Sequence, residues 1–157
     1  MYGPDHKYYE DVAEGDTWVS PPRVLTQADI QTFADLTGDF NPMHVDPEYA
    51  ATMPFGRTIA HGLLTLARAS GGSIDHPPMR TLAIVELRSV IFRAPVFPGD
   101  ELHVRSTVVA KERRGRGKRG LVTWKREAIN QEGKVVQEGT SVTLVEAREP
   151  PPPRLSD

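Results

Sequence analysis

An acid and a base lie five positions apart in the sequence, at Asp39 and His44. Asn41 and Pro42 stand between them, and a proline disfavours helical geometry at the preceding residue, so this pair predicts a turn. The turn can bring the carboxylate and the imidazole onto one water molecule. Such a pair can act as general base and general acid.

The same residues also fit a purely structural interpretation. Asp-x-Asn-Pro forms an ordinary Asx-type turn, in which Asp39 would cap backbone amides and His44 would fill a gap. A catalytic imidazole would need burial and a charged neighbour to bring its pKa into the working range. The spacing alone leaves both interpretations open.

A metal site is a third chemistry for this region. Asp39, His44, Asp46 and His61 could be imagined as ligands, but a His-x-Asp pair on a turn is common. No second pair has convincing metal-ligand spacing. We therefore expect no metal, and we expect the ring of His61 to brace the loop before the following helix.

Two short helices are predicted on either side of the turn. Thr26 and Asp29 form an N-terminal capping pair for a helix that ends at Gly38. Asp46 is the expected N-cap of a second helix that runs to about Thr52. The turn between the helices should therefore present its polar side chains on irregular backbone.

The rest of the chain predicts an α+β layout. Residues 63–70 are apolar on most faces, which is typical of a helix surrounded by protein. A short strand is expected near residues 16–20. Four longer strands are expected at residues 81–92, 101–110, 121–129 and 135–146. This order fits a curved antiparallel sheet wrapped around a central apolar helix.

Length and composition limit the classes of function. The 157 residues predict a single domain over residues 1–148, followed by a Pro-rich flexible tail at 149–157. Lys plus Arg number 19 and Asp plus Glu number 21, a balance that does not favour nucleic acid as a partner. The chain has no cysteine and no long apolar run, so we expect a cytoplasmic protein without disulfides and without a membrane span. A single sheet leaves open edges, and this predicts a homodimer or a higher homo-oligomer.

A basic segment at residues 111–119 leads into a Gly-x-Gly-x-x-Gly pattern at 115–120. A dinucleotide fingerprint needs a strand before it and a helix after it, whereas the residues that follow predict another strand. We therefore interpret 115–120 as a hairpin loop and the charges around it as a solvated face.

Two motifs resemble those of the MaoC-like dehydratase family, which includes R-specific enoyl-CoA hydratases of the hot-dog fold. They are Asp39-x-Asn41-Pro42-x-His44-x-Asp46 and Phe55-Gly56-x-x-Ile59-Ala60-His61-Gly62. The likeness extends over residues 8–146. It implies a hot-dog fold and a hydro-lyase of fatty acid metabolism that hydrates trans-2-enoyl-CoA to (R)-3-hydroxyacyl-CoA.

The resemblance also implies roles for individual residues. Asp39 and His44 match the catalytic pair that holds the water. The backbone N–H of Gly62, at a helix N-terminus, matches the group that stabilises the thioester oxyanion. Asn41 would orient the loop or the water. Ser70 would line the site.

The implied substrate is a thioester of coenzyme A or of an acyl-carrier protein, and no separate cofactor is needed because adding water requires only proton transfer. His61 is a candidate substrate-binding residue beside its structural role. Arg116 and Arg119 could attract coenzyme A phosphates across a dimer. A thioesterase and a non-catalytic acyl-thioester-binding subunit remain alternatives, because one fold hosts several functions.

Overall fold

The structure is a computed structural model that describes residues 3–148, so the predicted tail at 149–157 lies outside the described residues. Its helices are α1 (Gln27–Thr37), α2 (Pro42–Val45), α3 (Pro47–Thr52) and α4 (Gly62–Gly72), with short 3-10 turns η1 (Tyr9–Asp11) and η2 (Gly115–Gly117). Its strands are β1 (Thr17–Val19), β2 (Arg23–Val24), β3 (Thr81–Phe92), β4 (Glu101–Arg114), β5 (Arg119–Ile129) and β6 (Val135–Glu146). Within the described range, no helix is long and apolar enough to cross a membrane.

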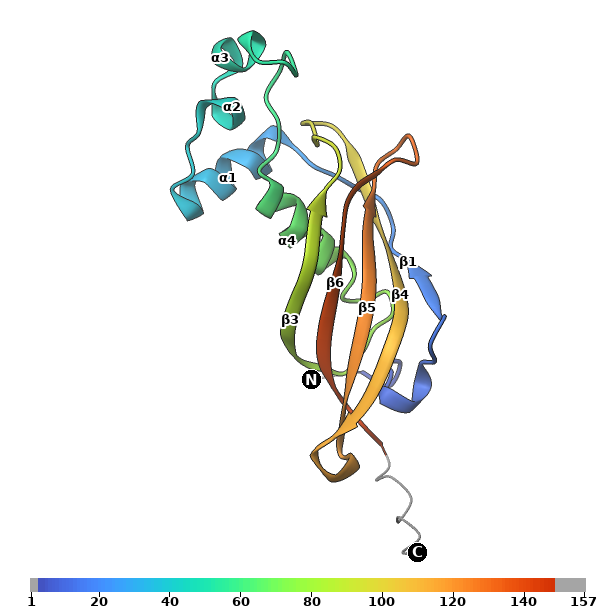
Figure 1. The fold of residues 1–157 in the computed structure, drawn as a ribbon. Coiled ribbons are helices and arrows are strands. Elements are labelled where there is room, and N and C mark those ends of the chain that lie inside the picture. The colour runs from blue at the N-terminus through green and yellow to red at the C-terminus, as the bar shows by residue number, and fades with distance from the viewer. Residues whose placement is uncertain (1–2, 149–157) are drawn as a thin grey trace, which may run out of the picture.

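The strands form one antiparallel sheet in the order β1-β4-β5-β6-β3, with β2 paired to the start of β4. Helix α4 lies along one face of this sheet, and α1, α2 and α3 extend beyond one of its ends (Figure 1). The predicted α+β class and the four long strands are confirmed. The short strand β2 was not predicted, because two residues carry no periodic pattern.

The hairpin between β4 and β5 is longer than predicted. Strand pairing continues through Lys111 to the pair Arg114–Arg119, so only residues 115–118 form the turn. Part of the basic segment is engaged within the chain, because Arg113 pairs with Glu10 at 2.8 Å and Lys111 donates to the carbonyl of Val12. The predicted solvated face holds for the exposed basic residues nearer the turn but not for these two.

Two apolar clusters hold the fold together. One joins α1 and α4 to the sheet through Leu25, Ile30, Leu64 and Val136. The other lies near the N-terminal segment, where Tyr9, Val12, Val122, Trp124 and Val145 pack together. Burial of these side chains supplies most of the stabilisation that positions the helical end of the molecule.

Helix α4 is less enclosed than the sequence predicts. Leu64, Thr65 and Ala69 are buried, but Leu63 is 64% exposed on the opposite side. Strand β3, at the edge of the sheet, is also exposed along most of its length. A single copy of the chain therefore leaves an apolar surface uncovered beside the helix.

The backbone between α1 and α3 is more regular than expected. The capping pair of Thr26 and Asp29 is present, and Gly38 ends α1 with a left-handed φ of 77°. The prediction of irregular backbone at His44 is wrong, because Asn41 caps a short helix whose first residue is Pro42. Proline is favoured at that position because the first N–H of a helix has no partner to lose.

Candidate functional site

Asp39, His44 and His61 come together at the helical end of the molecule. Their ligand-capable side-chain atoms lie within 4.8 Å of one another. Asp39 follows α1, His44 lies on α2, and His61 is the N-cap residue of α4. Three separate local structures are therefore needed to assemble the cluster.

The ring of His44 is buried, and its Nδ1 lies 2.7 Å from the carbonyl oxygen of Ile59. A carbonyl can only accept, so Nδ1–H is the donor and Nε2 of the neutral ring carries the free lone pair. Burial lowers the pKa of His44, with a smaller lowering from His61, while the Ile59 hydrogen bond and the Asp39 charge act in the opposite direction. The ring is therefore a neutral base at pH 7.

His61 makes its hydrogen bond through the other ring nitrogen. Its Nε2–H donates to the backbone carbonyl of Asp39 at 2.9 Å, while its buried Nδ1 has no hydrogen-bond partner among residues 3–148. Its ring packs against Phe33 with centroids 5.1 Å apart. His61 thus ties the start of α4 to the residue that carries the carboxylate, which is the bracing position expected from the sequence.

The carboxylate of Asp39 lies on the exposed side of the cluster. Its Oδ1 accepts from the backbone N–H of Asn41 at 3.3 Å. The side chain of Asn41 is used as a helix cap, because its Oδ1 accepts from the N–H of Met43 at 3.3 Å. This geometry suits Asn41 to orienting the loop that carries Asp39.

A cavity of about 470 Å³ opens beside His44. Gly62 and Thr65 of α4 line it on one side, and Phe92 and Val136 of the sheet line it on another. As the first residue of α4, Gly62 has a backbone N–H without an intrahelical partner, at the positive end of the helix dipole. An anionic oxygen in the cavity would find a donor there.

Thr65, Phe92 and Val136 are site-lining residues that the sequence did not indicate. Phe92 and Val136 come from strands far along the chain. They reach the cavity because β3 and β6 are neighbouring strands of the sheet. Their register places Phe92 opposite Gln137. Only the register of the sheet reveals this, and a β-type run does not specify register.

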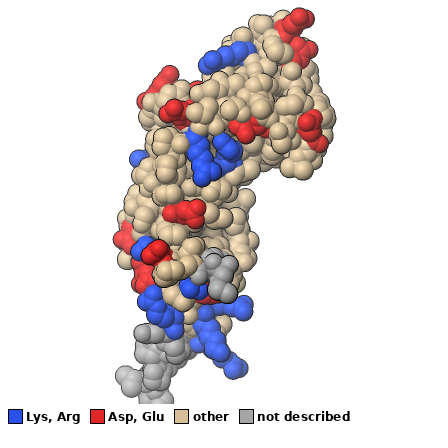
Figure 2. Space-filling model, turned by 180° about the vertical axis from the view of Figure 1, so that it is seen from behind, with Lys and Arg blue, Asp and Glu red and all other residues tan. Residues whose placement is uncertain are grey.

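Three predicted binding residues lie away from the cluster. Ser70 lies further along α4, where it lines two smaller cavities with Arg126. Arg116 and Arg119 lie at the β4–β5 hairpin, at the opposite end of the sheet from α2 and α3 (Figure 1). Lys and Arg side chains gather at that end in Figure 2. Within one chain these arginines do not reach His44.

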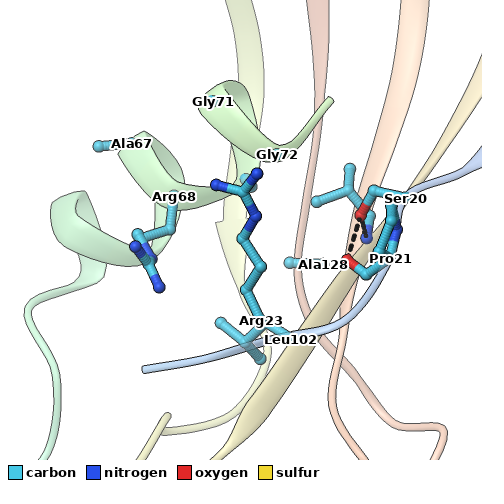
Figure 3. A pocket seen from close by; sticks show the side chains of 11 residues that line it. Ser20, Pro21, Arg23, Ala67, Arg68, Gly71, Gly72, Leu102 and Ala128 are labelled. Atoms are coloured by element: carbon cyan, nitrogen blue, oxygen red, sulfur yellow. Dashed lines mark hydrogen bonds between the residues drawn. The ribbon is translucent and has the colours of Figure 1, made fainter. Parts of the chain in front are cut away.

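A further cavity of about 150 Å³ lies between β2, the C-terminal half of α4 and β4. Arg23 and Arg68 extend their side chains into this region (Figure 3). Arg68 is already engaged, since it donates to the carbonyl of Val24 at 2.8 Å and lies 3.9 Å from Asp29. This cavity contains none of the residues predicted for the reaction.

The same cluster also bears on metal binding. The sequence offered no second ligand pair, whereas the fold brings one ligand-capable side-chain atom from each of Asp39, His44 and His61 into one group. Imidazole and carboxylate are donors that transition metals accept. Reaction without metal stays a prediction, and a chelator provides its test below.

Comparisons with known proteins identify the family of the chain. The sequence profile of the MaoC like domain matches residues 12–131. The chain is 35% identical over 149 residues to the (R)-specific enoyl-CoA hydratase of Rhodospirillum rubrum, covering 90% of this chain and 93% of that protein. It is 37% identical over 108 residues to Protein MaoC of Klebsiella aerogenes, with 69% of this chain matched, but it spans only 32% of that longer protein.

A solved structure supports the architecture. A conserved hypothetical protein from Mycobacterium tuberculosis, described as having a double hot-dog fold, superposes with a TM-score of 0.83 at 20% identity. The match covers 97% of this chain and 48% of that one, so the present chain corresponds to one of two repeats in length. Together with the profile match, this shows that the chain is a hot-dog protein of the MaoC-like dehydratase family.

Proposed function

We propose that the protein catalyses the reversible hydration of a trans-2-enoyl thioester to the (R)-3-hydroxyacyl thioester. The observation that carries this is the grouping of Asp39 with His44, whose Nε2 carries the free lone pair and which lines a largely apolar cavity. The name of the Rhodospirillum rubrum relative supports both the substrate class and the R configuration. Coenzyme A is the proposed carrier.

In the proposed reaction, one water molecule bridges Asp39 and His44. Nε2 of His44 takes a proton from the water as its oxygen bonds to C3 of the enoyl group. The electron pair of the C2–C3 double bond moves onto the thioester oxygen, where the N–H of Gly62 stabilises the negative charge. The imidazolium, stabilised by the Asp39 carboxylate, then gives the proton to C2 and returns to its neutral form.

The proposed enzyme is a homodimer formed through β3. This strand pairs only with β6 among the described residues, and its other edge is open. Apolar side chains along it, including Ile84, Val85 and Leu87, are about half exposed. An open, apolar edge strand is a ready surface for a second copy of the same strand.

A twofold dimer would also give Arg116 and Arg119 a function. Antiparallel pairing of two β3 strands reverses the second chain, so the basic hairpin of one copy comes to the same end as the His44 cluster of the other. Guanidinium groups suit phosphate oxygens.

Charge reversal at both arginines should raise KM for enoyl-CoA, and the effect should shrink as salt is added. An unchanged KM at low salt would contradict this role.

The function is tested by following the absorbance of the enoyl-thioester band with crotonyl-CoA, after treatment with a chelator. Asp39→Asn and His44→Ala should each lower kcat by about a hundredfold, the usual scale for a general acid or base. Asp35→Asn is the matched control, because this exposed carboxylate of α1 bonds only to Gln31 in the described structure. Full activity in both site variants, or thiol release from saturated acyl-CoA instead of hydration, would refute the proposal.

A further inference from the structure

We propose that the acyl group of the substrate extends along α4 to a small chamber around Arg126, and that this chamber selects acyl chains ending in a carboxylate. The inference rests on the proposed function and adds a substrate class to it. The chamber is defined by Ser70, Arg126, Gln137 and Ser141, which line one small cavity.

Arg126 lies near the middle of β5, on the side of the strand that faces α4. Its Nε–H donates to Oγ of Ser141 at 2.9 Å, and its Nη1 donates to Oγ of Ser106 at 3.3 Å. Its guanidinium also lies 5.3 Å from the ring centre of Trp124. All three partners are uncharged, and no carboxylate lies within ion-pair distance in the described part of the chain.

A positive charge in this position is costly without an anion. Removing a cation from water is compensated only when a counter-charge and hydrogen bonds replace the lost hydration. Burial lowers the pKa of Arg126 to about 10, so the group is still charged at pH 7. The C-terminal turn of α4 offers about half a negative charge through its carbonyl dipoles, which leaves the rest unbalanced.

Gln137 adds an independent sign of an unused polar site. Its side chain is buried, and its Oε1 has no hydrogen-bond partner among the described residues. Buried polar atoms in native proteins nearly always find a partner, so one that lacks a protein partner points to a ligand or a water. Rotation about the last side-chain torsion of Gln137 presents either its amide oxygen or its NH₂ group to the chamber.

The chamber lies further along α4 than the cavity beside His44. On α4, Gly62 and Thr65 line the large cavity, while Leu66 and Ser70 line the chamber. Gly62 and Ser70 are eight residues apart, which corresponds to about 12 Å along a helix.

The sheet shows the same progression. On β3, Phe92 borders the large cavity, and Val90 and Leu87 border the chamber. On β6, Val136 is followed by Gln137 in the same way. An acyl chain with its thioester oxygen at the N–H of Gly62 and its length along α4 would extend toward Arg126.

The chamber is small, and a few polar groups stand in its mostly apolar wall. The two cavities that meet at Arg126 have volumes of about 20 and 60 Å³. A methyl end placed there would leave the guanidinium without a counter-charge and Oε1 of Gln137 without a partner, which is a strong penalty for a ligand. A carboxylate would instead accept charge-assisted hydrogen bonds from Arg126.

The test compares substrates that differ only at the far end of the chain. They are trans-2-hexenoyl-CoA against trans-2-hexenedioyl-CoA, and trans-2-octenoyl-CoA against trans-2-octenedioyl-CoA, where each diacid carries CoA on the carboxyl next to the double bond. We expect kcat/KM to be at least about tenfold higher for the carboxylated member of at least one pair, as a charged hydrogen bond implies. Arg126→Gln should abolish this preference, and Arg126→Lys should keep part of it.

Arg105→Gln is the control variant, because Arg105 lies on the neighbouring strand β4 and pairs with Glu127 at 2.8 Å. It should leave the substrate preference unchanged. Equal kcat/KM within both pairs, or an equal loss for all substrates in Arg126→Gln, would overturn the proposal and leave Arg126 a structural residue.

A binding measurement separates this inference from the proposed function. Adipoyl-CoA and hexanoyl-CoA are saturated, so neither can be hydrated, and their affinities for the wild-type protein are measured by calorimetry. Tighter binding of adipoyl-CoA would support the chamber even if no enoyl-CoA were hydrated. Equal affinities together with hydration of neutral enoyl-CoA would refute the chamber and retain the hydratase.

Discussion

The imidazole rings of His44 and His61 lie nearly face to face, with centroids 3.9 Å apart and planes inclined by 32°. Each ring donates an N–H to a backbone carbonyl of the chain segment that carries the other ring. His44 donates to Ile59, two residues before His61, and His61 donates to Asp39, five residues before His44. The two histidines thus cross-link the segments that carry the proposed reacting groups.

This arrangement predicts a loss of stability in acid. The pKa of His44 is lowered in the folded protein, chiefly by burial, so the unfolded chain binds the proton more readily. Stability should therefore fall as the pH drops through the unfolded value of about 6.5 toward the lower folded pKa. Urea midpoints measured between pH 8 and pH 5 test this. The decrease should be smaller in His44→Gln, and an identical decrease in both proteins would contradict the assignment.

Adding a methyl group at Gly62 should affect activity more than stability. A Cβ there would lie 3.0 Å from the ring of Phe92, and this half-exposed ring can move outward into the cavity. We expect a change in unfolding free energy of about 1 kcal/mol or less, since alanine also favours the helix.

The displaced ring should nevertheless lower kcat/KM of Gly62→Ala by about tenfold, which corresponds to about 1.4 kcal/mol of transition-state stabilisation. Gly72→Ala is the control, because its Cβ would meet Val104 at an ordinary 3.6 Å. Phe92→Leu should restore part of the activity in the Gly62→Ala background. No recovery in the double variant would show that the ring is not the cause.

The N-terminal segment should depend on a glycine of β5. A Cβ on Gly120 would lie 2.0 Å from the ring of Tyr9, so Gly120→Ala must displace that ring from its cluster. We expect a cost of about 1–3 kcal/mol, as for other overpacked sites. Urea unfolding of Gly120→Ala, Tyr9→Ala and the double variant measures the coupling. Additive costs would show that the two residues do not compete for space.

A charge on the edge strand should separate the proposed dimer. Val85→Asp places a carboxylate among the exposed apolar side chains of β3, where pairing with a second copy would bury it. Sedimentation should show a dimer for the wild type and a monomer for the variant, with loss of turnover. Leu36→Asp is the control, because Leu36 on α1 is 80% exposed and away from β3. A dimeric Val85→Asp protein would exclude this interface.

Much of the fold followed from local patterns. The capping pair at Thr26 and Asp29, the N-cap at Asp46 and the β-type runs each specify a nearby backbone, and all are present. The short helix α2 was missed, because Asn-Pro before His44 fits both a turn and a helix start. In the structure the helix is accompanied by contacts that the local sequence does not encode, the stacking of His44 against His61 and its hydrogen bond to the carbonyl of Ile59.

The candidate site likewise has a part that the local sequence predicts and a part that depends on tertiary packing. Asp39 and His44 are close in sequence, so the sequence could pair them. The approach of His61 to both and the wall formed by Phe92 depend on how α4 lies on the sheet. Those contacts join residues far apart along the chain, and no local spacing encodes them.

All of the groups proposed to move protons or stabilise charge in the reaction lie in one uninterrupted stretch, residues 39–62, between α1 and α4. The sheet contributes walls and the acyl groove. In this proposal, the reaction and the choice of acyl chain are encoded by different parts of the gene. A duplicated copy could lose its reactive stretch and still fold as a scaffold for an active partner. Exchange of the stretch alone should transfer the reaction to a related sheet while leaving that sheet's preference for acyl chains in place.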